Sequence, residues 1–215
     1  MGFLQGAISY TAYEVLSVPG PEFRTGLLDG LSRGRIGPID IDLGRDRTVG
    51  FATWEDPLDA EFTETKVFFD SVVAFSFRID RLSVPSTTLK LYVRRRVAEV
   101  LAATHRTKLP KQERDELTDQ LRTDLLRKTV PAITACDVIW DTATGRLRFF
   151  STSQAINDEF LTHLREILKV ETRPMNTVGI LERGLDERTL HDVYHLLPTT
   201  FLAPGEIRLP QGGRA

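Results

Sequence analysis

Cysteine is almost absent from this chain of 215 residues, which holds Cys136 alone. One cysteine excludes a disulfide within a subunit and any zinc or iron–sulfur centre built from several cysteines. Such usage is typical of a reducing cytoplasm, where we expect the protein to reside. A nucleophilic Cys136 would need a basic partner that lowers its pKa, so the favoured interpretation is a small buried residue near the start of a strand.

Long apolar runs are missing too. No stretch approaches the roughly 20 apolar residues that span a bilayer, and residues 1–10 lack a basic segment followed by an apolar one. We therefore expect neither a membrane span nor a targeting signal. Hydrophobic residues make up 41% and charged residues 27% of the chain, which is ordinary globular usage and indicates neither disorder nor a fibrous architecture.

The sequence also lacks the motifs of nucleotide chemistry. Gly30, Gly34 and Gly37 lie close together, but they occupy a loop without the strand-to-helix context of a phosphate-binding motif. We therefore predict no nucleotide hydrolysis and no bound cofactor.

Two groups of side chains have the chemistry to hold a metal ion. Asp40, Asp42 and Asp46 form the densest acidic group, as a magnesium-dependent nuclease needs, but arginines interleave with them and a solvated loop is favoured. His191 and His195 are spaced i, i+4 on a predicted helix, without the glutamate of zinc proteases between them. A pair on a helix surface is the favoured interpretation, so we predict no metal site and no catalytic residue.

Hydrophobic periodicity and turn residues divide the chain into strands and helices. The predicted strands are 3–18, 48–54, 67–82, 137–140, 146–150 and 172–181, and the predicted helices are 22–31, 86–104, 110–131, 156–168 and 186–196. We expect Ser86 to be the N-cap of its helix and Pro110 to be the first residue of the next one. Because strands and helices do not strictly alternate, the fold class predicted is α+β, with mixed, largely antiparallel sheets and flanking helices.

The domain organisation follows from the same pattern. We expect one α+β unit over residues 1–203, in which residues 85–131 form a protruding or central αα-hairpin. The halves before and after this hairpin have mirrored orders of strands and helices, which indicates two similar layers. Residues 204–215 contain proline and several glycines and are expected to be a mobile tail.

Positive charge is concentrated in one segment, although the net charge of the chain is only −2. Residues 86–130 hold 11 Lys or Arg against 6 Asp or Glu, a net charge of +5, which leaves −7 for the remainder. Since consecutive helical residues turn by about 100°, three arginines in a row cannot all face a core. Such a segment can contact phosphates, although a long solvated helix gives a similar count. The predicted DNA-binding residues are Lys90, Arg94, Arg95, Arg96, Arg106, Lys108, Lys111 and Arg114.

A family resemblance favours the DNA interpretation. A Pro-Ser start to a long helix, a Lys-rich connection into a second charged helix, and a hairpin with a Trp, an Asp-Thr turn and a Gly together resemble the recombination-associated RdgC family. The residues that carry this pattern are Val84-Pro85-Ser86, Leu89 to Val100, Lys108 to Leu121, Ile139-Trp140-Asp141-Thr142 and Gly145. Gly50 to Leu58, with Trp54 and Pro57, is weakly similar to a region near the family's N-terminus. The resemblance covers residues 1–183 and is concentrated in residues 84–150.

The resemblance implies a nucleoid-associated protein that binds double-stranded DNA without sequence preference. It also implies a ring-shaped homodimer around the duplex and restraint of RecA-promoted strand exchange. The chain is expected to lack most of the family's C-terminal third, which leaves ring closure and RecA antagonism open. Because the family is also labelled an exonuclease, a magnesium-dependent DNA exonuclease is the first alternative. The negative net charge of the whole chain favours a second alternative, a protein-interaction module that binds no nucleic acid.

Overall fold

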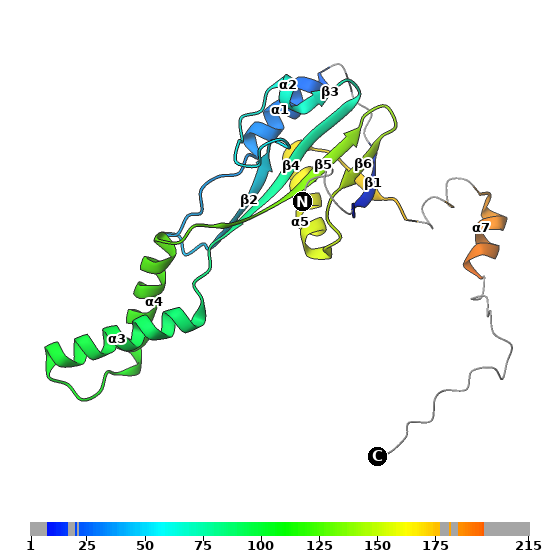
Figure 1. Ribbon diagram of the computed structural model, residues 1–215. Coiled ribbons are helices and arrows are strands. Elements are labelled where there is room, and N and C mark those ends of the chain that lie inside the picture. The colour runs from blue at the N-terminus through cyan, green and yellow to red at the C-terminus, as the bar shows by residue number, and fades with distance from the viewer. Residues whose placement is uncertain (1–7, 17–19, 21, 177–180, 182–184, 196–215) are drawn as a thin grey trace, which may run out of the picture. The chain divides into compact units, whose positions relative to one another are not determined.

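The computed structural model in Figure 1 describes residues 8–16, 20, 22–176, 181 and 185–195. The chain divides into two compact units, Met1–Pro174 and Met175–Ala215. The second unit contains helix α7 (Glu187–Tyr194). The segment 204–215, expected to be a mobile tail, lies outside the described residues.

One antiparallel sheet forms the centre of the first unit. Its strands are β1 (Thr11–Val15), β2 (Arg47–Ala52), β3 (Phe68–Phe69), β4 (Val72–Arg81), β5 (Ala132–Asp141), β6 (Arg146–Phe149) and β7 (Thr172–Pro174). The strand order is β2-β4-β5-β6-β1-β7, and β3 pairs with β4. Every pairing between these strands is antiparallel, which confirms the predicted α+β class.

The two halves of the chain share this sheet, so the expectation of two similar layers is wrong. β4 from the first half pairs with β5 from the second half along their whole length, from Val72 opposite Asp141 to Arg81 opposite Ala132. Both strands place alternate apolar side chains on the same face of the sheet. Because the two strands pair, these side chains form one continuous core. Two separate layers would divide the same side chains between two smaller cores.

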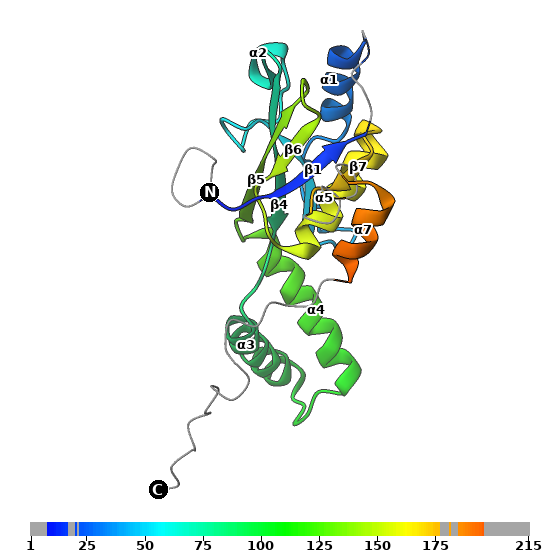
Figure 2. The same ribbon diagram turned by 90° about the vertical axis from the view of Figure 1, so that its right-hand side faces the viewer.

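Helices cover the apolar face of the sheet. The helices of the first unit are α1 (Phe23–Arg33), α2 (Glu64–Val67), α3 (Ser86–Thr104), α4 (Lys111–Arg127) and α5 (Gln154–Leu168). α1 and α5 pack against each other, and Figure 2 shows both on the same side of the sheet. Phe77 of β4 and Phe149 of β6 contact Phe160 of α5, whose ring stacks on that of Phe149 with a centroid distance of 4.1 Å. Val73, Phe75, Phe77 and Ile79, which are alternate residues of β4, are all buried in this core.

The strand predicted over residues 67–82 is wrong in its first part. Val67 ends α2, and the chain then reverses around Asp70, which has a positive φ of 57°. Phe68 and Phe69 pair back onto β4, opposite Val73 and Val72. The apolar residues on both sides obscured this reversal, because Asp70 and Ser71 give a weaker turn signal than glycine or proline.

The helix starts are each shifted by one residue from the prediction. Pro85 is the N-cap of α3 and Ser86 its first residue, while Pro110 is the N-cap of α4, which begins at Lys111. No side chain caps either helix at these positions. A proline favours extended backbone for itself and the residue before it, which places each boundary at the proline.

The outer edge of β2 is covered by a short piece of extended chain. The backbone N–H of Phe51 donates to the carbonyl of Gly34 at 2.8 Å, and the N–H of Ile36 donates to the carbonyl of Phe51 at 2.9 Å. This parallel bridge lies so close that a Cβ atom at Gly50 would stand 2.5 Å from the nitrogen of Ile36. The edge is thus protected from pairing with another chain.

None of the described helices is long and apolar enough to cross a membrane.

Candidate nucleic-acid interface

α3 and α4 form the candidate interface. They connect β4 to β5 and pack against each other, as Figures 1 and 2 show. α3 ends at Thr104 and is capped by His105, whose φ of 54° turns the chain and whose backbone N–H donates to the carbonyl of Leu101. Val93 of α3 and Leu126 of α4 are buried, while most other apolar side chains of the two helices remain partly exposed. The pair therefore presents a large surface to solvent.

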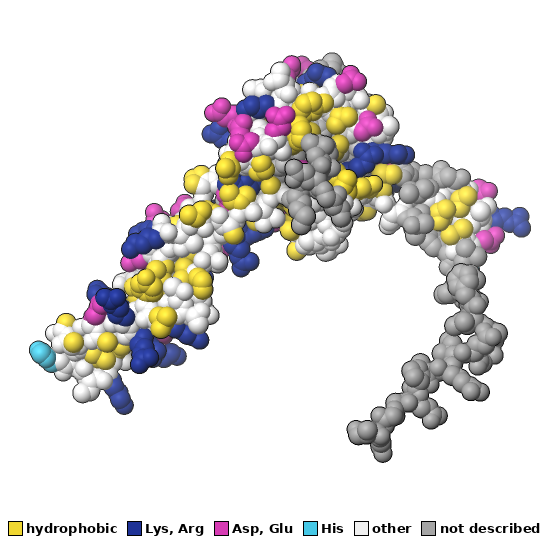
Figure 3. Space-filling model, viewed as in Figure 1, with side chains coloured by type: hydrophobic (Ala, Val, Ile, Leu, Met, Phe, Trp, Pro, Cys, Tyr) yellow, Lys and Arg dark blue, Asp and Glu magenta, His cyan; other side chains and the backbone are white. Residues whose placement is uncertain are grey.

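All eight cations predicted to bind DNA are exposed. Figure 3 shows Lys and Arg side chains spread along the two helices, with hydrophobic side chains between them. The charge is unequal between the helices. α3 carries Lys90 and three arginines against Glu99, whereas α4 carries more acidic than basic residues. The positive potential is thus concentrated on α3 and on the connection that follows it.

Three of the eight cations are already held by carboxylates. Arg95 and Arg96 both donate to Glu99, with nitrogen–oxygen distances of 3.3 and 3.1 Å. These hydrogen bonds, that of Arg96 first, lower the pKa of Glu99 and keep it charged. Arg106 donates to Glu113 across the connection at 3.1 Å. Phosphates would have to compete with these carboxylates for the three arginines.

A groove between the helices gathers three of the other cations. It has a volume of about 670 Å³, and its lining residues are Ser86, Leu89, Lys90, Val93, Arg94, Val97, Arg114 and Thr118. Among the residues that the structure describes, Lys90, Arg94 and Arg114 form no ion pair. Because consecutive helical positions turn by about 100°, Arg94 faces this groove while Arg95 and Arg96 turn away towards Glu99. The three cations can neutralise an anion, and Leu89, Val93 and Val97 form an apolar surface beside it.

Lys108 and Lys111 stand apart from this groove. Lys108 is exposed in the connection between the helices, and Lys111 is the first residue of α4. Neither forms an ion pair with any residue in the described part of the chain. They extend the cationic surface towards the turn of the hairpin.

Two aspartates of the acidic loop that we weighed as a nuclease centre form ion pairs with α4. Arg127 donates to Asp42 at 2.5 Å, and Arg122 lies 3.7 Å from Asp46. The side chain of Asp40 accepts from the backbone N–H of Leu43. Described residues contain no group of three or more His, Cys, Asp or Glu side chains that could hold a metal ion. The role of Asp42 and Asp46 was missed because their partners lie far away in the sequence.

Cys136 is buried, as its interpretation as a small buried residue requires. Burial raises the pKa of its thiol, and a hydrogen bond with Ser151 opposes this only in part. A thiol held in its neutral form is a poor nucleophile.

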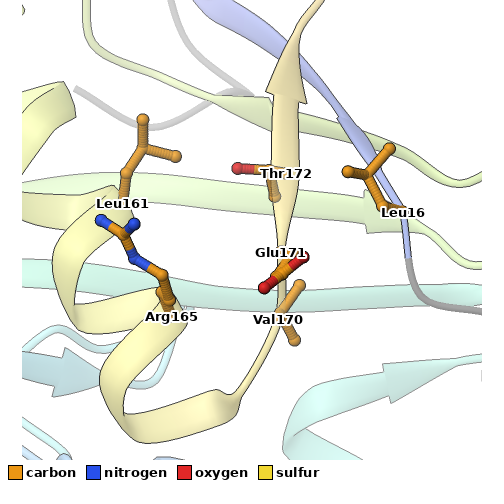
Figure 4. A pocket seen from close by; sticks show the side chains of 6 residues that line it. All are labelled: Leu16, Leu161, Arg165, Val170, Glu171 and Thr172. Atoms are coloured by element: carbon orange, nitrogen blue, oxygen red, sulfur yellow. The ribbon is translucent and has the colours of Figure 1, made fainter.

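A second cavity of about 380 Å³ lies between α5, β7 and the end of β1 (Figure 4). Leu16, Leu161 and Val170 give it an apolar wall, while Arg165 and Glu171 bring opposite charges to its rim. These charges largely offset each other for an approaching anion. The cavity therefore offers less to a phosphate than the groove between α3 and α4.

Together the fold and the interface define a class of protein, an antiparallel α+β domain that carries a cationic pair of helices between its two longest strands. A model of the RdgC family, described as "Putative exonuclease, RdgC", matches residues 47–183, and the chain belongs to this family. The match begins in β2, includes both helices of the interface and extends past β7. No curated protein matches the chain. Membership confirms the resemblance and associates the chain with DNA and recombination.

Proposed function

We propose that the protein binds double-stranded DNA without sequence preference, as a nucleoid-associated homodimer that acts in recombination or replication. The observation that carries this proposal is the cluster of Lys90, Arg94 and Arg114 around the groove. These three cations form no ion pair with any described residue, and they lie on a member of a DNA-associated family. Phosphate contacts of this kind release counterions and give affinity that ignores base sequence. A duplex coated in this way would also resist RecA-promoted strand exchange.

Binding is tested with two unrelated labelled duplexes in chelator-containing buffer. We expect equal affinities for both, and a logarithm of the affinity that falls linearly with the logarithm of the salt concentration by about 0.9 for each phosphate contact. Fluorescence anisotropy measures both quantities. Unchanged anisotropy at low salt and micromolar protein would defeat the proposal and support an interaction module instead.

Addition of Mg²⁺ separates binding from the exonuclease that the family description names. We expect linear DNA to stay intact, because no acidic cluster within the described residues suits a magnesium ion. Gel electrophoresis of end-labelled DNA follows the reaction over time. Steady shortening that a chelator abolishes would show that the exonuclease alternative is correct.

Self-association has its own support. Leu91, Val130 and Ile133, on α3 and at the base of the hairpin, expose 67%, 84% and 43% of their surface. Burial of such side chains against a second copy would remove them from water. We expect sedimentation at micromolar concentration to give twice the 24.3 kDa of one chain. A species of 24.3 kDa under these conditions would contradict the homodimer.

A further inference from the structure

His191 of α7 and His195, the residue that caps the C-terminus of α7, face each other through the same ring nitrogen. His191 and His195 lie one turn apart, and their Nε2 atoms are separated by 3.2 Å. Their ring centroids are 4.3 Å apart. Both side chains are exposed, so an ion from solvent can reach them. The helix that carries them is capped by Asp186, which accepts from the backbone N–H of Thr189 at 2.8 Å.

The separation of the two nitrogens suits a shared metal ion. Zinc–nitrogen bonds are about 2.0–2.1 Å long, so two Nε2 atoms 3.2 Å apart subtend an angle of about 100° at a zinc ion bound to both. This angle is close to that of tetrahedral coordination, the geometry that zinc prefers. A hydrogen bond between neutral imidazoles produces the same separation, and a metal ion would take the place of the shared proton.

A carboxylate lies at the opposite end of one ring. The Oδ1 atom of Asp192 is 3.8 Å from the Nδ1 atom of His191. Histidines that bind metals commonly direct their second nitrogen towards a carboxylate, which fixes the tautomer and strengthens the ligand. At 3.8 Å this contact is too long for a hydrogen bond, so Asp192 contributes a negative charge beside the ring that favours a bound cation.

We propose that His191 and His195 bind one divalent transition-metal ion of the kind that imidazole prefers, such as Zn²⁺, with water in the remaining positions. Described residues supply no third ligand, so the pair is a two-ligand chelate, weaker than a closed structural zinc site. The site belongs to the second unit, whereas the candidate DNA interface belongs to the first. The i, i+4 spacing of the two histidines did not by itself predict a metal site, because spacing does not define the distance between the ring nitrogens. The separation of 3.2 Å supplies that evidence.

Titration of the untagged full chain with ZnCl₂ tests the proposal. The affinity and stoichiometry of zinc binding are compared between the unmodified chain and single variants. We expect one ion per chain, an affinity about 100-fold lower for His191→Gln or His195→Gln because one arm of the chelate is lost, and a smaller loss for Asp192→Asn, which removes only a neighbouring negative charge. His105→Gln is the matched control, since His105 is exposed and solitary, and it should bind like the unmodified chain.

Nuclear magnetic resonance of the unmodified chain provides a readout that does not depend on any variant folding correctly. The ring protons of His191 and His195 should shift together and reach their end point at one equivalent of zinc. Equal loss of affinity in the His105 variant, or shifts that spread evenly over all four histidines, would overturn the proposal.

Discussion

Replacement of Lys90, Arg94 and Arg114 together by alanine is expected to lower affinity for duplex DNA by about 500-fold at 0.1 M salt. Loss of three phosphate contacts reduces the slope of log affinity against log salt concentration by about 2.7. If the two proteins bind equally at 1 M salt, this difference in slope gives a difference in affinity of about 500-fold at 0.1 M salt. The loss should be equal on unrelated duplexes. Anisotropy titrations across a range of salt concentrations measure both the slope and the affinity.

The matched control removes the same number of charges from cations that carboxylates already hold. Arg95, Arg96 and Arg106 pair with Glu99 and Glu113, so their replacement by alanine should reduce the slope much less. Substitutions at exposed helical positions usually change stability by within about 0.5 kcal/mol, and circular dichroism should confirm that both variants are folded. Equal losses in the two triple variants would mean that net charge, and not the groove, holds the DNA.

Replacement of Gly50 by alanine is expected to destabilise the fold by about 2–3 kcal/mol. The added Cβ atom would stand 2.5 Å from the nitrogen of Ile36 and 2.6 Å from its Cα atom. Both are backbone atoms of the segment that pairs with β2, so relief of the overlap requires that segment to move away from the edge. Denaturant-induced unfolding gives the difference in the free energy of unfolding.

Gly26 provides the opposite case within the same fold. It lies in α1, and a Cβ atom added there meets nothing within 4 Å. Replacement by alanine should therefore stabilise the helix by about 0.5–1 kcal/mol. If both glycine variants unfold at the same denaturant concentration, the close approach at Gly50 does not constrain the edge of the sheet.

Much of the interface could be predicted because it depends on local signals. The period of apolar residues and the two prolines placed α3 and α4 within a few residues of their observed limits. Consecutive arginines on a helix cannot all be buried, so helix geometry alone predicted that at least two of the three arginines are exposed. β5 was predicted too short, because its first residues are small or polar, and its length is determined by pairing with β4.

The grouping of the cations could not be predicted in the same way. Arg114 joins Lys90 and Arg94 only through the packing of α4 on α3, and no spacing within either helix encodes that contact. Asp42 and Arg127 are 85 residues apart, so their ion pair appears only in the folded chain. Charge counts identified the right segment, but the split between cations that face the groove and cations held by Glu99 required coordinates.

The pairing of Arg81 with Ala132 has a consequence for how this domain can change in evolution. These two residues close the sheet at the point where the chain leaves for α3 and returns from α4. The register of β4 and β5 therefore depends on the pairing of these strands and not on the length or composition of α3 and α4. Helical turns or charges can be gained and lost there while the aromatic core stays the same. Such a connection separates the contact surface, which depends on the two helices, from the sheet that forms the scaffold.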